Sequence, residues 1–166
     1  MKSKIRGMAV SAVIAAIYTV LTILPGLNLI SYGAVQFRIS EMLTVLPLFT
    51  PWAIPGLGIG CFVSNLLSTA GALDIIFGTG ATLLAAGCTW HLRNKPKAVA
   101  VLPVIIINAV IIGWMITYFY TNAVQNFSEV LVFNMISVGI GQAGVCYILG
   151  LPLAVYIEKH RNIFKI

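Results

Sequence analysis

Residues 98–121 are AVAVLPVIIINAVIIGWMITYFYT, a stretch without a charged side chain. A helix needs about 20 mainly apolar residues to cross the hydrocarbon core of a bilayer, so this stretch is long enough. The whole chain agrees, because 60% of its 166 residues are hydrophobic, only 8% are charged, and the mean hydropathy is +1.01. A soluble domain carries about 25% charged residues. The sequence therefore predicts an integral membrane protein and excludes a soluble enzyme, a nucleic-acid-binding domain and a disordered linker.

The other apolar stretches predict five further spans. They cover residues 5–24, 37–50, 52–70, 73–92 and 128–157. Six spans would use roughly 120 residues, so residues 1–166 are predicted to form a single all-α membrane domain with short loops. The apolar connection 25–36 is predicted either to fold back against the protein, where it would act as a lid, or to lie at the membrane interface.

The basic residues predict how this domain sits in the membrane. Nine of the ten lysines and arginines form three clusters that fall on one side of a six-span topology: Lys2, Lys4 and Arg6; Arg93, Lys95 and Lys97; Lys159, Arg161 and Lys165. Loops rich in lysine and arginine stay in the cytoplasm, so both termini are predicted to be cytoplasmic. The net charge of +6 is thus explained by topology rather than by a nucleic-acid partner.

Four ionisable side chains fall in the outer half of the domain or in its outer loops, where ionisable groups at membrane depth are costly and often functional. Arg38 and Glu41 are three residues apart, so on a helix they share a face. They either form a structural ion pair or bind a ligand. Asp74 begins the fourth span and either caps it or binds a ligand. For Glu129, in the first turn of the sixth span, the structural role is favoured.

Several polar and aromatic side chains are predicted to lie at a similar depth. An interhelical hydrogen bond or a position at the membrane interface would explain any one of them alone. Their shared depth instead predicts a pocket that opens to the outside, with aromatic walls and a few hydrogen-bonding groups. The residues that predict this pocket are Arg38, Glu41, Asn65, Asp74, Trp114 and Asn134.

Small residues line one face of the first span, at Ala9, Ala12 and Ala16. Small residues allow helices to approach closely, so this face serves either internal packing or docking to a partner membrane protein. Gly56 and Gly60 form a second small-residue face, for which we predict internal packing.

No catalytic constellation is evident in the sequence. Cys61, Cys88 and Cys146 are far apart within apolar stretches, so we predict that they are packing residues. Residues 139–144, GIGQAG, match a dinucleotide-binding pattern, but they lie in an apolar span with no strand before them. We therefore predict no enzyme activity, no cofactor, no metal site and no nucleotide-hydrolysing motor in this chain.

Three stretches are distinctive: VQFRISEMLTVLP at 35–47, AIPGL at 53–57 and LDIIFG at 73–78. Together they resemble the queuosine-precursor transporter (QueT) family of substrate-binding S-components of energy-coupling-factor (ECF) vitamin transporters. The resemblance implies a six-helix S-component in the bacterial cytoplasmic membrane, with an outward-facing site. It also implies two kinds of partner: a transmembrane coupling protein, contacted by the face that holds Ala12 and Ala16, and two cytoplasmic ATPases.

The implied ligand is a 7-deazaguanine such as queuine or one of its precursors. Its edge presents a ring N–H and an exocyclic amine, and one carboxylate, of Glu41 or Asp74, can accept from both. Arg38 or Asn65 could donate to the ring carbonyl. The aromatic candidates for stacking on the flat ring are Phe37 and Trp114.

Three alternatives remain at this stage. The chain could be an S-component for another vitamin or a cation, which would share the topology and the docking face. It could instead be a self-contained channel or ion-coupled carrier, which would need no ATPase. An intramembrane enzyme fits least, because the sequence has neither a nucleophile–base pair nor a metal cluster.

Overall fold

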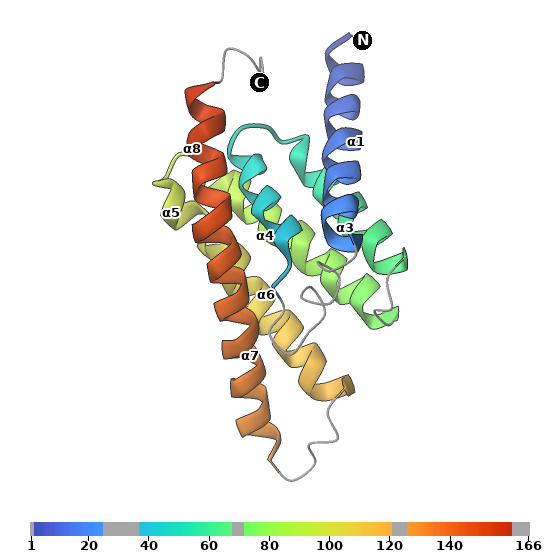
Figure 1. Ribbon diagram of the computed structural model, residues 1–166, viewed down its shortest axis with the longest axis vertical. Coiled ribbons are helices and arrows are strands. Elements are labelled where there is room, and N and C mark those ends of the chain that lie inside the picture. The colour runs from blue at the N-terminus through green and yellow to red at the C-terminus, as the bar shows by residue number, and fades with distance from the viewer. Residues whose placement is uncertain (1, 25–36, 68–71, 121–125, 161–166) are drawn as a thin grey trace.

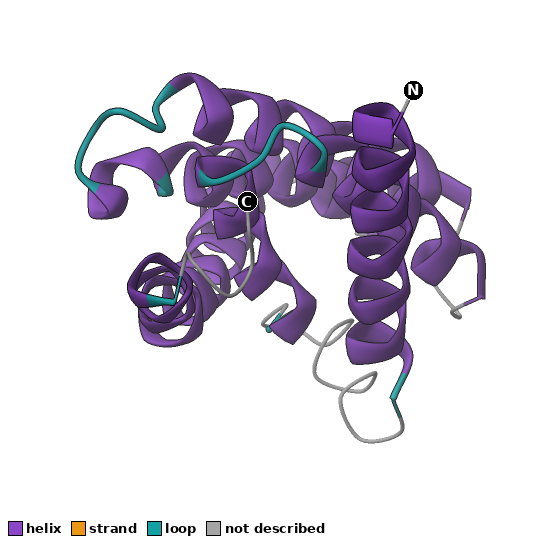
Figure 2. Ribbon diagram, turned by 90° about the horizontal axis from the view of Figure 1, so that it is seen from above, coloured by secondary structure: helices purple, strands orange, loops and turns teal. Residues whose placement is uncertain are grey.

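The computed structural model describes residues 2–24, 37–67, 72–120 and 126–160 (Figure 1). Within these ranges all regular secondary structure is helical (Figure 2). The predicted lid at 25–36 lies outside the described residues. The elements in chain order are α1 (Lys2–Ile23), the 3-10 helix η1 (Ile39–Leu48), α3 (Ala53–Leu67), the π-helical turn η2 (Asp74–Gly78), α4 (Thr79–His91), α5 (Lys97–Ala100), α6 (Leu102–Met115), the π-helical turn η3 (Ile116–Tyr120), α7 (Phe127–Gly144), the π-helical turn η4 (Val145–Gly150) and α8 (Leu151–Lys159).

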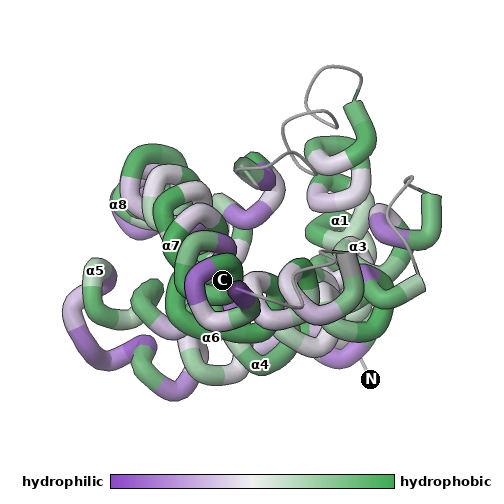
Figure 3. Tube along the Cα trace, turned by 90° about the horizontal axis from the view of Figure 1, so that it is seen from below, coloured by the Kyte–Doolittle hydropathy of each residue, from purple (hydrophilic) through white to green (hydrophobic). Residues whose placement is uncertain are grey.

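The described helices include three that are long and apolar enough to cross a membrane. They are Lys4–Ile23, Lys97–Phe119 and Phe127–Lys159, and the shorter apolar helices η1 and α3 accompany them. Hydrophobic residues run along most of the helical trace, whereas the connection before α5 is hydrophilic (Figure 3). The all-helical, multi-pass class is confirmed, while the count of six spans and the orientation stay predictions.

The second predicted span is the element that differs most from expectation. Instead of a membrane-spanning helix over 37–50, the chain forms the 3-10 helix Ile39–Leu48. At about 2.0 Å rise per residue, its ten residues extend roughly 20 Å, less than the 30 Å hydrocarbon core. Six of its residues are buried, and it contacts α1, α3, α4, η4 and α8. The tighter 3-10 geometry suits a slim element that is surrounded in this way.

Helix α1 packs closely on α3 through glycines. A Cβ atom added at Gly56 would lie 2.8 Å from the Ser11 carbonyl oxygen, and one at Gly60 would lie 2.8 Å from the Cβ of Tyr18. No larger residue fits at either position without moving α1. The predicted packing role of Gly56 and Gly60 is therefore confirmed.

The start of α1 and the end of α8 lie at the same end of the molecule (Figure 1). The connection before α5 reaches this end too, because Lys97 Nζ lies 2.6 Å from Glu158 Oε2 of α8. The described parts of the three basic clusters thus share one end, which we call the basic end. Its placement in the cytoplasm stays a prediction.

Candidate functional site

The buried carboxylate of Glu41 lies where η1 meets α1. The residue is only 1% exposed. Tyr18 Oη donates a hydrogen bond of 2.6 Å to Glu41 Oε1. Glu41 Oε2 is buried and has no hydrogen-bond partner among the described residues. A buried carboxylate oxygen without a donor is costly, so this atom is the strongest pointer to a ligand in the described part of the chain.

A second polar contact joins the same two elements. Thr22 Oγ1 lies 2.7 Å from Ser40 Oγ and also donates to the Tyr18 carbonyl at 2.8 Å. Sequence reasoning missed Tyr18, although a tyrosine hydroxyl inside an apolar helix usually needs a buried partner. That requirement was the available signal. The two contacts fix Glu41 against α1.

Three polar side chains contact the sulfur of Cys61: Arg38, just before η1, Asn65 of α3 and Thr82 of α4. Arg38 Nη1 lies 3.8 Å and Asn65 Nδ2 lies 3.5 Å from Cys61 Sγ. Asn65 Nδ2 also donates to the Asp74 carbonyl at 2.8 Å. All of these residues are buried. The structure therefore brings Arg38, Asn65 and Asp74 together, and it gives Cys61 a polar role besides the predicted packing.

Close packing around this group extends to Gly78. A Cβ atom there would lie 2.9 Å from Asn65 Nδ2 and 3.9 Å from Arg38 Nη1. Asp74 follows the helical residues 72–73 and lies in the first turn of η2. Both alternatives for it, a structural role at the helix start and ligand binding, stay predictions. π-helical turns often occur at functional sites. We call Arg38, Glu41, Asn65 and Asp74 the polar cluster.

The sequence model of the QueT transporter family matches residues 8–159, which include the whole polar cluster. The chain belongs to the QueT transporter family. The queuosine precursor transporter QueT of Lactococcus lactis subsp. cremoris (strain MG1363) is 45% identical over 83 residues, which are 50% of this chain and 48% of that protein. The chain thus matches about half the length of this curated relative. No solved structure matches it.

The other predicted site residues of this QueT-family chain are Phe37, Trp114 and Asn134. None of their described contacts is with the polar cluster. The ring of Phe37 faces the end of α7, where a Cβ atom on Gly144 would lie 3.1 Å from its Cε2. Asn134 Nδ2 donates to Thr117 Oγ1 at 2.9 Å and so links α7 to η3. This contact is the interhelical hydrogen bond that the sequence leaves open as the alternative to a ligand-binding role for Asn134.

Trp114 belongs to a group of four aromatic side chains. Its ring stacks on Tyr118 with centroids 5.3 Å apart, and it also contacts Phe77 and Phe119. Trp114 is 38% exposed. Phe77 lies three residues after Asp74 in η2, so this aromatic group adjoins the element that carries one carboxylate of the polar cluster.

Proposed function

We propose that this QueT-family chain captures a 7-deazaguanine precursor of queuosine and is the substrate-binding S-component of an ECF importer. The observation that carries the ligand assignment is the buried Glu41 Oε2 atom without a hydrogen-bond partner among the described residues. A ligand that donates two adjacent N–H groups would satisfy it. The edge of a 7-deazaguanine does so through its ring N–H and exocyclic amine.

The residues around Glu41 fit the rest of such a ligand. Arg38 and Asn65 supply donors that suit the ring carbonyl. Asp74 adds a second carboxylate, which suits a precursor with a cationic aminomethyl group. The aromatic residues Phe37 and Trp114 remain our candidates for stacking, which contributes about 1–3 kcal/mol per base in nucleic-acid complexes.

Calorimetric titration of the purified chain tests the ligand assignment. Queuine and its aminomethyl and cyano precursors are titrated in turn, with guanine and riboflavin as controls. We expect tight binding of at least one deazaguanine and at least tenfold weaker binding of riboflavin. A well-folded sample that binds no deazaguanine would contradict the assignment and leave the membrane architecture untouched.

The proposed partners are an ECF transmembrane coupling protein and two cytoplasmic ATPases. Support for the docking face comes from the two sides of α1. Ser11 and Ala15 are buried, whereas Ala9, Ala12 and Ala16 are exposed. The exposure of these alanines supports a face of small residues on which a partner helix docks.

Replacing Ala12 by tryptophan is expected to abolish uptake while leaving ligand affinity within about twofold of the parent. The bulky side chain would hold the coupling protein away from α1, whereas the polar cluster lies on the buried side of the helix. Uptake is measured in vesicles that contain the complete importer, and affinity by calorimetry.

The matched control is Val110→Trp, because Val110 is also an exposed helical residue, on α6. It should transport like the parent. Unchanged uptake by the Ala12→Trp protein would refute the docking face. Uptake by the chain alone, without ATPases, would instead identify a self-contained carrier.

A further inference from the structure

Two cavities are neighbours at the basic end. One is polar, has a volume of about 410 Å³ and lies between the α4–α5 connection and α8. The other is an apolar groove of about 390 Å³ between α1, the end of η1 and α8. Phe49 lines both, and consecutive residues of α8 divide between them, with Ile157 in the groove and Glu158 in the polar cavity.

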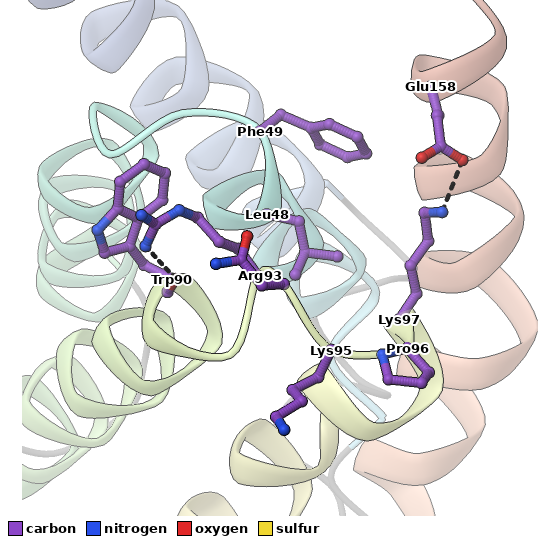
Figure 4. Close-up of a pocket in the computed structure, with 9 residues that line it drawn as sticks. Leu48, Phe49, Trp90, Arg93, Lys95, Pro96, Lys97 and Glu158 are labelled. Carbon is purple, nitrogen blue, oxygen red and sulfur yellow. Dashed lines mark hydrogen bonds and ion pairs between the residues drawn. The ribbon is translucent and has the colours of Figure 1, made fainter.

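The polar cavity carries an excess of positive charge. Three cations line it, Arg93, Lys95 and Lys97, against one carboxylate, Glu158. Glu158 pairs with Lys97 at 2.6 Å, so two of the three positive charges are uncompensated within the cavity. Figure 4 shows Arg93 and Lys97 on opposite sides of this space. Such a cavity suits a phosphate group, which carries negative charge and several acceptor oxygens.

The aromatic ring beside Arg93 fixes its guanidinium group. The Arg93 Cζ atom lies 4.0 Å from the centroid of the Trp90 ring, and Nη1 donates to the Trp90 carbonyl at 3.0 Å. The planar group is thereby held in place with donors to spare, since a guanidinium group has five. Tryptophan and arginine together are typical of the level at which lipid headgroups lie.

The groove has the opposite character. Its lining is mostly apolar and comes from α1, the end of η1 and α8: Val10, Val13, Ile14, Leu46, Phe49 and Ile157, together with Arg6, Ala9 and Thr50. Figure 1 shows α1 and α8 on opposite sides of the molecule at this end, with η1 between them. In a multi-pass membrane protein, a groove lined in this way suits a hydrocarbon chain.

We propose that the two cavities together bind one anionic phospholipid from the leaflet at the basic end. Its phosphate lies by Arg93 and Lys95, and one acyl chain passes Phe49 into the groove. Basic pockets between helices on the cytoplasmic side commonly hold anionic headgroups. The inference is independent of the ligand proposed for the polar cluster, because it uses other residues at the other end of η1.

Native mass spectrometry of the purified full chain tests this proposal, with phosphatidylglycerol and phosphatidylcholine of identical acyl chains as probes. Two cationic side chains should favour the anionic lipid by roughly 30-fold. The double variant Arg93→Gln, Lys95→Gln should bring the two lipids within a few-fold of each other. The matched control Lys4→Gln, Lys159→Gln removes two charges from the basic end, outside both cavities, and should keep the preference. Val13→Trp, which fills the groove, should weaken the binding of both lipids.

Three outcomes would overturn the inference. Equal loss of preference in the cavity and control double variants would show a diffuse surface charge. Binding of glycerol phosphate as tight as that of the lipid, unaffected by Val13→Trp, would show a site for soluble phosphate. The third outcome is that Val13→Trp blocks assembly with the importer proteins but leaves phosphatidylglycerol binding unchanged. It would assign the groove to a protein partner.

Discussion

The substitution Glu41→Gln is expected to weaken binding of the 7-deazaguanine by at least about 100-fold. A hydrogen bond to a charged group contributes about 1.5–3 kcal/mol, and two of them meet the ligand edge. Glutamine keeps the shape but replaces one acceptor oxygen with an NH₂ donor, which would oppose a donor of the ligand. The dissociation constants of parent and variant, measured by calorimetry in the same detergent, check this prediction.

The matched control is Glu129→Gln, because Glu129 is an exposed glutamate in the first turn of α7. It should bind like the parent. Tyr18→Phe removes the hydroxyl that donates to Glu41 Oε1 and should weaken binding less than Glu41→Gln does. Full affinity in the Glu41→Gln protein would eliminate Glu41 as the recognition residue and the main support for the ligand assignment.

Replacing Gly60 by leucine is expected to destabilise the fold by about 1–3 kcal/mol or more, the usual range for overpacking. Even the first added carbon would lie 2.8 Å from the Tyr18 Cβ atom and 2.9 Å from the Ala15 carbonyl oxygen. Helix α1 would have to move away from α3, and Tyr18 would move with it. The melting temperature in detergent should fall by several degrees, and ligand affinity should fall as well.

Gly87→Leu is the matched control, because nothing lies within 4 Å of a Cβ atom built at Gly87. It should keep or slightly raise the melting temperature, since glycine costs about 1 kcal/mol relative to alanine inside a helix. Equal melting temperatures for the two variants would refute the close contact between α1 and α3 at Gly60.

The helical class and the gathering of basic residues at one end could be predicted from the sequence. Both follow from features of a segment itself and do not depend on which other segments pack against it. Apolar length and composition determine whether a segment enters a bilayer. The position of a lysine or arginine relative to the spans then gives its side. The packing role of Gly56 and Gly60 could also be predicted, because a face of small residues has few uses other than close packing.

The inner arrangement of the candidate site could not be predicted in the same way. The 3-10 geometry of η1 depends on burial among five other elements, which local sequence does not contain. The Tyr18–Glu41 hydrogen bond joins residues 23 positions apart, and Cys61 gathers partners from three elements. The predicted depth grouped Arg38, Asn65 and Asp74, which the structure brings together, but depth alone could not separate them from Trp114 and Asn134.

The π-helical turn Val145–Gly150 joins α7 and α8 into one continuous helix. The two parts of this helix make their contacts at opposite ends of the molecule. One added residue in a helix rotates everything after it by about 100° about the axis. The number of residues in this turn therefore sets which face of α8 points toward the groove, while the face of α7 that points toward Phe37 does not depend on it. A one-residue deletion within this turn would swing Ile157 and Glu158 around the axis while α7 keeps its orientation. Small insertions and deletions at this point would reorient the part of α8 that lines the proposed lipid site, while α7 keeps its contact with Phe37.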